Sequence, residues 1–404
     1  MPLKLPKKVR FLLEINTLYA YIFHRLLVKI RTTFKLPPLY PCEESYRFDE
    51  EIQNWLTQLQ KSIPDADRGD NPAFNKNWKS IFEREEKAKT VSSNIKRITG
   101  DIRFDIDPSH LNSIRRIGYA RLNDKKLKTQ TVDRIVDYLN EQKVYPAHVA
   151  HFAIQKPQEK TVIKKRHPFG SYDLGTILKA PFAAQMLSDP RVIGTIADYF
   201  GCLPTISSIN LFWAFTSSDG KSRGPQRFHR DIDDHKTCTM FINLTDTKKN
   251  EGAHCYIEKT HTLENLKEIF SDGKNDDLPN DLNPWKRRIT PDDFFQLPLN
   301  GYSFDKLYNH FFQGHIVNLC GERGTVLITD NYGIHRGMPS SENDRLILWV
   351  SYALTATHTQ SASVKLMKRA AYGEIKDHIE DNKTNRYVLR NVVDFCSKCT
   401  QVGS

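Results

Sequence analysis

Residues 324–354 read GTVLITDNYGIHRGMPSSENDRLILWVSYAL, and they contain two apolar segments separated by a polar one. The first segment, GTVLITD, and the second, RLILWVSYAL, are rich in β-branched and aromatic residues, and each has the length of a strand. His335 follows the first segment and Arg345 opens the second. The stretch therefore predicts two strands that have polar residues with possible chemistry at their ends.

The remaining sequence predicts a β-rich core that follows helical segments. Further strand-like runs are TISSINLFWAF (205–215), TCTMFINL (237–244) and AHCYIEK (253–259). Helical patterns occupy part of 111–124, all of 131–142 and 190–201. Many short strands after a helical lead-in favour a jelly-roll or barrel-like core. The expected fold class is mainly β with flanking helices.

Changes in composition divide the chain into four parts. These are a basic amphipathic segment (1–40), a variable helical and loop region (41–110), the β domain (111–360) and a C-terminal extension (361–404). The β domain is interrupted at about 264–313 by a stretch too long for a simple turn, which we interpret as an insertion with some helix. We expect the C-terminal extension to be helical and polar.

Charge is concentrated at the N-terminus. The formal net charge is +11, and within residues 1–40 eight lysines and arginines against Glu14 alone give +7. The remaining residues are therefore close to balanced, which argues against a nucleic-acid-binding groove along the body. Apolar residues recur in the same segment at helical spacing, namely Leu12, Ile15, Tyr19, Ile22 and Leu26.

This pattern predicts a basic helix within residues 1–36 that contacts an anionic membrane from its surface. The alternative is that its apolar face packs on the core. Seven scattered cysteines are typical of a reducing compartment, so we expect a cytoplasmic protein, with the membrane contact placing it at an inner membrane face. Cys396 and Cys399 predict an ordinary turn rather than a zinc site, because no second pair accompanies them.

Residues 228–236, FHRDIDDHK, place His229 and Asp231 two positions apart. On an extended strand both side chains point to the same side, so an imidazole and a carboxylate can bind one metal. His335 provides a third ligand, and two histidines with one carboxylate are the set associated with iron(II) oxygenases. The planar guanidinium of Arg345 can bind the far carboxylate of 2-oxoglutarate through two parallel hydrogen bonds. Alone, however, a His-x-Asp triplet is common, and a lone buried arginine more often pairs with a structural carboxylate.

Taken together, these motifs resemble the phytanoyl-CoA dioxygenase family of iron- and 2-oxoglutarate-dependent oxygenases. The resemblance runs from about Leu111 to Leu354. It rests on IRRIGYARL (114–122), LSDPRVIGTIADYFGCLP (187–204), FHRDIDDHK, INLTDTKKNEGAHCYIEKTH (242–261) and the stretch 324–354.

The resemblance implies a double-stranded β-helix (cupin-like) core for residues 111–360 and an enzyme that hydroxylates a C–H bond. It implies His229, Asp231 and His335 as ligands of Fe(II), and Arg345 as the clamp for 2-oxoglutarate, with O2 as the second co-substrate. It also places Phe241 beside 2-oxoglutarate. Gly337 departs from the family, where a hydroxyl can help to hold 2-oxoglutarate. The insertion has no counterpart.

Several alternatives stay open at the level of sequence. A non-catalytic jelly-roll module that binds a sugar or a lipid is the alternative to the oxygenase. The substrate is expected to be a small organic molecule, with a saccharide or glycolipid preferred to an acyl-CoA. His254 and His261 are interpreted as structural or solvent-facing rather than as metal ligands. Phe212, like Trp213 and Phe215, is interpreted as core or as the lining of a pocket.

Overall fold

The computed structural model describes residues 81–122, 127–150, 153, 155–216, 226–231, 234–270, 308–354 and 370–395. All of them belong to one structural unit of the chain, Ile52–Ser404. The predicted amphipathic segment 1–40 and the pair Cys396 and Cys399 lie outside the described residues. None of the described helices is long and apolar enough to cross a membrane.

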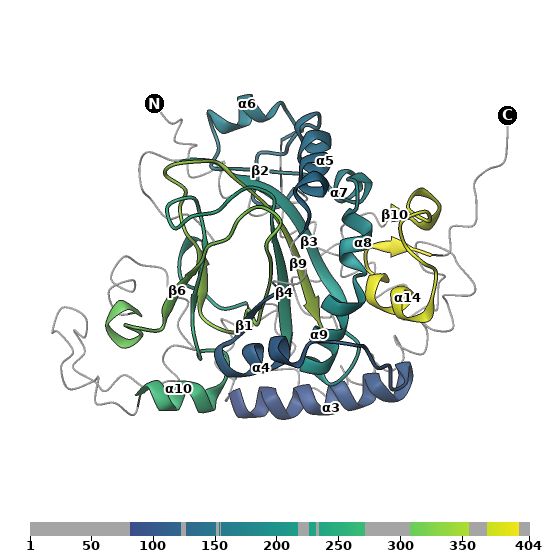
Figure 1. Ribbon diagram of the computed structural model, residues 1–404, viewed down its shortest axis with the longest axis vertical. Coiled ribbons are helices and arrows are strands. Elements are labelled where there is room, and N and C mark those ends of the chain that lie inside the picture. The colour runs from purple at the N-terminus through teal and green to yellow at the C-terminus, as the bar shows by residue number, and fades with distance from the viewer. Residues whose placement is uncertain are drawn as a thin grey trace, which may run out of the picture. The chain divides into compact units, whose positions relative to one another are not determined.

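Two antiparallel sheets form the centre of this unit (Figure 1). The larger sheet has the strand order β1-β7-β4-β9-β3-β2, and the smaller sheet has the order β6-β5-β8. The larger sheet consists of β1 (Tyr119–Arg121), β2 (Phe169–Ser171), β3 (Thr205–Ala214), β4 (Thr237–Asn243), β7 (Val326–Thr329) and β9 (Arg345–Ala353). The smaller sheet consists of β5 (His254–Ile257), β6 (Ile316–Leu319) and β8 (His335–Gly337). A separate parallel pair joins β10 (Ala370–Ala371) to β11 (Val393–Asp394).

The two sheets face each other across an interior to which β5 contributes every second side chain. Tyr256 packs with Phe241 of the larger sheet in one buried cluster. Cys255 and Ile257 belong to a different cluster, on the opposite face of the smaller sheet. Because successive residues of a strand point to opposite faces, His254 shares the interior face with Tyr256. The interior between the sheets is therefore where a polar side chain of β5 is buried.

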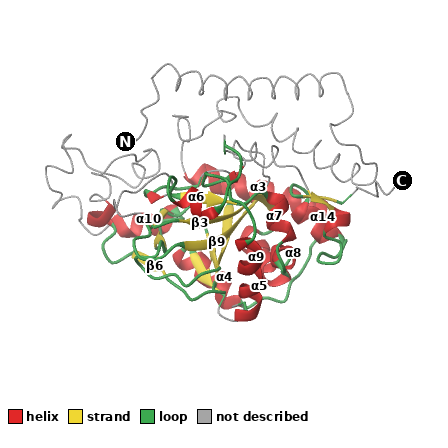
Figure 2. Cartoon of the chain, turned by 90° about the horizontal axis from the view of Figure 1, so that it is seen from above, coloured by secondary structure: helices red, strands yellow, loops and turns green. Residues whose placement is uncertain are grey.

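Helices cover the outer face of the larger sheet (Figures 1 and 2). The Tyr352 hydroxyl on β9 donates to the carbonyl of Leu187 at 3.3 Å, and the Tyr172 hydroxyl donates to that of Leu139 at 3.0 Å. The described helices, of which α10 packs on the smaller sheet instead, are α3 (Ile81–Thr99), α4 (Pro108–Ile117), α5 (Thr129–Asn140), α6 (Lys160–Lys164), α7 (Leu174–Lys179), α8 (Ala183–Leu187), α9 (Pro190–Phe200), α10 (Leu263–Phe270), α14 (Lys383–Leu389) and the 3₁₀ turn η6 (Tyr372–Glu374). This cover buries the second apolar face of β9, which explains why its sequence does not alternate.

The C-terminal residues 370–395 contribute to the core, contrary to the expected polar extension. Tyr387, Val388 and Leu389 at the end of α14 are buried. The Asn391 side chain donates to the carbonyl of Ile206 on β3 at 2.9 Å, so the segment is tied to the larger sheet.

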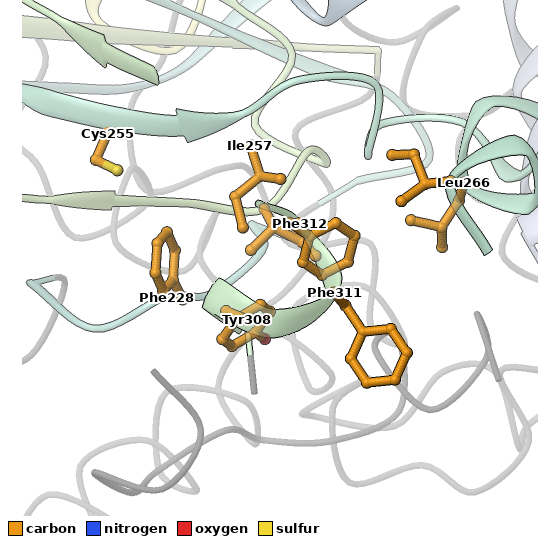
Figure 3. Packing of buried hydrophobic residues seen from close by; sticks show 9 residues of the cluster. Phe228, Cys255, Ile257, Leu266, Tyr308, Phe311 and Phe312 are labelled. Carbon is orange, nitrogen blue, oxygen red and sulfur yellow. The ribbon is translucent and has the colours of Figure 1, made fainter. Parts of the chain in front are cut away.

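The two ends of the expected insertion pack against the outer face of the smaller sheet (Figure 3). Leu266 on α10 lies in the same buried cluster as Tyr308 and Phe312. Phe228 belongs to this cluster too, and its ring centroid lies 4.9 Å from that of Tyr308. The packing therefore holds the residue that precedes His229.

Most of the predicted elements are present. The strand-like runs at 205–215, 237–244, 253–259, 324–330 and 345–354 form β3, β4, β5, β7 and β9, and the three helical patterns form α4, α5 and α9. The short elements α6 to α8, β2, β6 and β8 were not predicted. The expected class, mainly β with flanking helices, is confirmed in its antiparallel sheets. It understates the helical content, because more of the described residues lie in helices than in strands. The reason is that the larger sheet needs an apolar cover on its outer face.

We predict that Gly118→Ala destabilises the fold by about 2–4 kcal/mol, measured by denaturant unfolding. Gly118 has φ +96°, and a Cβ at this position would overlap the Tyr256 hydroxyl. Gly314→Ala is the matched control, because its φ is +87° and its Cβ would meet nothing within 4 Å. In Gly314→Ala, the free energy of unfolding should fall only by the cost of the left-handed backbone conformation, about 1–2 kcal/mol. Equal losses in the two variants would contradict a tight contact at Tyr256.

Candidate metal centre

The three predicted ligands are brought together by backbone pairing. The amide N–H of His229 donates to the carbonyl of His335 at 2.9 Å, and the amide of His335 donates back at 2.9 Å. The amide of Asp231 donates to the carbonyl of Asn331 at 2.9 Å. His229 forms only an isolated bridge, so the expected continuous strand through His229 and Asp231 is wrong in detail. The predicted convergence of the side chains still holds.

His229, Asp231 and His335 each offer one ligand atom, and these atoms lie within 4.8 Å of one another. The Nε2 of His229 is 3.6 Å from Asp231 Oδ1, and the Nε2 of His335 is 3.6 Å from Asp231 Oδ2. Two ligands that are each about 2.1 Å from one ion are at most about 4.2 Å apart. Both separations therefore fit a single metal ion. In the described part of the chain, no other group of three such residues has this arrangement.

Hydrogen bonds fix the tautomer of both imidazoles. The Nδ1 of His229 lies 2.7 Å from the carbonyl of Arg227, and the Nδ1 of His335 lies 2.9 Å from that of Gly333. A carbonyl oxygen only accepts hydrogen bonds, so each Nδ1 carries the proton. In the neutral imidazole, Nε2 then carries the lone pair on the side of Asp231, and this is the tautomer that a metal at this position requires.

A short chain of side chains orients the carboxylate. The Asn331 amide donates to Asp231 Oδ2 at 2.8 Å, and the Thr329 hydroxyl donates to the amide oxygen of Asn331. Asn331 was not predicted from the sequence. Its position in DNYGIHRG, four residues before His335, was the available signal.

The centre is open on one side. The side chain of His335 is 4% exposed, whereas those of His229 and Asp231 are 33% and 19% exposed. Burial, together with the neighbouring His229, lowers the pKa of His335 and favours its neutral form. A metal held here would be anchored from the protein side and accessible past His229.

Arg345 occupies the start of β9 as predicted, and it is buried. Its Nη1 donates to the carbonyl of Gly252, its Nη2 lies 3.4 Å from the Asn243 side-chain oxygen, and its Nε has no partner. Among the described residues the guanidinium has no carboxylate partner, so the alternative of a structural ion pair is not found there. Burial lowers the pKa of Arg345 to about 10, which leaves it protonated near neutrality. A buried cation without a counter-ion is suited to an incoming anion.

Phe241 and His254 lie together in the interior. Their ring centroids are 4.5 Å apart, and the centroid of His254 is 5.2 Å from that of His335. His254 and His261 are both buried, so the solvent-facing interpretation of either is wrong. His261 meets the carbonyl of Arg115 at 3.1 Å, as a structural residue would. Neither is among the three grouped ligands, and the role of Phe241 stays a prediction.

Sequence reasoning missed His148, which lies near the ligands. Its ring centroid is 4.3 Å from that of Phe212 and 5.1 Å from that of Phe169. Burial lowers its pKa to about 4, with His229 lowering and Asp231 raising it. No motif marked His148, because it lies in a loop far from both ligand segments in sequence.

No protein-family model matches the sequence, and no curated protein is significantly similar to it. Solved structures that superpose on part of the chain include SnoK from nogalamycin biosynthesis, a non-heme alpha ketoglutarate dependent carbocyclase. It is 13% identical, with a TM-score of 0.39, over 63% of this chain and 87% of that one. The epimerase SnoN in complex with Fe3+, alpha ketoglutarate and nogalamycin RO is 13% identical, with a TM-score of 0.38, over 61% of this chain and 84% of that one.

A third structure is HygX from Streptomyces hygroscopicus with nickel, 2-oxoglutarate and hygromycin B bound. It is 12% identical, with a TM-score of 0.35, over 61% of this chain and 86% of that one. At these identities and scores the similarities assign no reaction to this chain. The argument for function therefore rests on its own residues.

We expect Asp231→Ala to weaken Fe(II) binding strongly, because it removes the anionic ligand, and to abolish any iron-dependent oxidation while the fold persists. Asn331→Ala should weaken Fe(II) binding by about 10- to 100-fold, since it frees the carboxylate to rotate. Anaerobic titration calorimetry measures both. Asp133→Asn is the control, because this carboxylate is exposed and paired with Arg323 at 2.6 Å. Wild-type affinity in Asp231→Ala would remove Asp231 from the ligand set.

Proposed function

We propose that the chain is an Fe(II)- and 2-oxoglutarate-dependent dioxygenase with a double-stranded β-helix core, which hydroxylates a C–H bond of a small organic, saccharide or lipid-linked substrate. The observation that carries the proposal is the combination of two elements. His229, Asp231 and His335 bring three ligand atoms within 4.8 Å of one another, and Arg345 is a buried cation with no carboxylate partner among the residues that the structure describes. A site that only bound a neutral sugar or lipid would need neither.

The residues fit the implied metal and co-substrate. Two neutral imidazoles and one carboxylate are a ligand set for non-haem Fe(II) that leaves coordination positions open. The unpartnered Nε of Arg345 and its charge suit the far carboxylate of 2-oxoglutarate. When bound, iron and 2-oxoglutarate supply the oxidation of the substrate by O2, with release of succinate and carbon dioxide.

The protein's own residues hold the three candidate ligands in position and limit the access of water to the centre. The carbonyls of Arg227 and Gly333 hold the imidazoles, and Asn331 holds Asp231. The apolar cluster that contains Phe241 lies in the interior, and its side chains limit the access of water to that side of the centre. The substrate would approach past the partly exposed His229, beside His148.

The direct test is anaerobic addition of 2-oxoglutarate to the Fe(II)-loaded protein. The proposal expects a weak metal-to-ligand absorption band in the visible range, and succinate formation once O2 is admitted. The non-catalytic sugar- or lipid-binding module predicts neither signal. Screening saccharides and glycolipids first, then acyl-CoA compounds, for succinate release above the substrate-free rate would identify the substrate class.

Arg345→Lys should weaken 2-oxoglutarate binding by about 10- to 100-fold and leave Fe(II) affinity unchanged. Lysine keeps the charge but loses the planar fork that matches a carboxylate. The absorption band reports 2-oxoglutarate affinity, and calorimetry reports the metal. A lowered melting temperature with unchanged 2-oxoglutarate affinity would instead assign Arg345 a purely structural role.

We also propose that the protein is cytoplasmic and that residues 1–36 bring it to an anionic membrane face. The support is the charge of +7 within residues 1–40 together with the apolar repeat there. Deletion of residues 1–36 should abolish salt-sensitive sedimentation with anionic liposomes and leave Fe(II) binding unchanged. If the segment packs on the core, the deletion lowers the melting temperature, and the full chain does not bind liposomes.

A further inference from the structure

The imidazole of His254 is a buried polar group that the ligand set does not use. Its Nε2 is buried and has no hydrogen-bond partner in the described part of the chain. Leaving such a group unsatisfied costs about 1–3 kcal/mol, so a buried ring nitrogen without a partner calls for a physical reason. One reason is that a ligand satisfies it.

The strand register places His254 at the edge of the metal centre. On the smaller sheet Tyr256 pairs with His335, and His254 pairs with Gly337. Since His335 and Gly337 are two residues apart, the His254 ring shares a face with the His335 ring, and their centroids are 5.2 Å apart. Glycine at 337 contributes no side chain beside His254.

The turn that precedes β5 connects His254 to Arg345. Gly252, two residues before His254, accepts a hydrogen bond from the Nη1 of Arg345 through its carbonyl. Burial lowers the pKa of His254, and the nearby His335 and Arg345 lower it further. The guanidinium and the imidazole thus each have one buried nitrogen without a partner, Nε and Nε2 respectively.

Packing holds the imidazole in place. The ring of Phe241 lies against it, with centroids 4.5 Å apart. Both residues are buried, so the orientation of the imidazole is set before any ligand arrives. A preorganised donor binds an anion with little loss of side-chain entropy.

We propose that the Nε2–H of His254 donates a hydrogen bond to the far carboxylate of 2-oxoglutarate and shares this carboxylate with Arg345. The inference rests on the proposed function. A carboxylate has two oxygens with about four acceptor sites, enough for both orphaned donors at once. His254 would be a binding residue for the co-substrate, opposite the side-chain-free position 337.

The test compares 2-oxoglutarate with pyruvate, a 2-oxo acid that lacks the far carboxylate. His254→Phe and the smaller His254→Leu both remove the donor, whereas His254→Gln keeps one. Dissociation constants are measured anaerobically on the Fe(II)-loaded full chain from the absorption band, and Fe(II) affinity is measured by calorimetry. His261→Gln controls for the loss of a buried imidazole, since His261 is bonded to the Arg115 carbonyl.

We expect His254→Phe and His254→Leu to weaken the binding of 2-oxoglutarate by about 10- to 100-fold. His254→Gln should restore part of this affinity. The binding of pyruvate and of Fe(II) should stay unchanged in all three variants. Unchanged 2-oxoglutarate affinity in a folded Phe or Leu variant would overturn the inference alone. An equal loss of affinity for pyruvate would also overturn it, because His254 would then contact the 2-oxo acid end of the co-substrate, next to the metal. If the wild-type protein does not bind 2-oxoglutarate, the proposed function fails and the inference fails with it.

Discussion

His229 and His335 exchange two backbone hydrogen bonds, and the other features of the centre depend on this pairing. It joins two segments of the chain whose side chains meet 100 residues apart, at Asp231 and Asn331. Once the backbones are paired, the carbonyls of Arg227 and Gly333 are placed to accept from the two imidazoles. The tautomer of the two imidazoles is therefore a consequence of the backbone pairing. A change that shifts one segment against the other would separate His335 from His229 and Asp231.

The pairing is itself supported from outside the interior. Phe228 precedes the first ligand and packs in the cluster that includes Tyr308 and Leu266, which come from the two ends of the expected insertion. On the other side, the Tyr256 hydroxyl donates to the carbonyl of Asp330 at 2.8 Å, in the loop that leads to the third ligand. The described ends of the insertion thus have a structural role near the candidate metal centre.

The interior combines apolar packing with a few buried polar groups. Phe241, Tyr256 and their neighbours make it a low-dielectric space. In such a space, an uncompensated guanidinium is costly, and a bound anion would offset that cost. His254 lies between the two sites, because its ring centroid is 5.2 Å from that of His335 and it follows Gly252, whose carbonyl accepts a hydrogen bond from Arg345. The same reasoning makes the buried Nε2 of His254 a candidate contact for that anion, which its position in the sequence did not indicate.

The sequence by itself determined the elements with strong local signals. Residues 205–215, 237–244 and 345–354 form strands because their β-branched and aromatic residues suit a pleated, buried surface. The pattern His-x-Asp, a later histidine and Arg345 indicated the ligand types. Only the tertiary structure decided what depends on contacts between distant residues. Short strands such as β8 exist through their partners, the C-terminal residues are buried by packing on β3, and Asn331, His148 and His254 reach the centre because two sheets face each other. Such contacts leave no periodic signal, since the distance along the chain between the residues that meet is set by the fold rather than by local geometry.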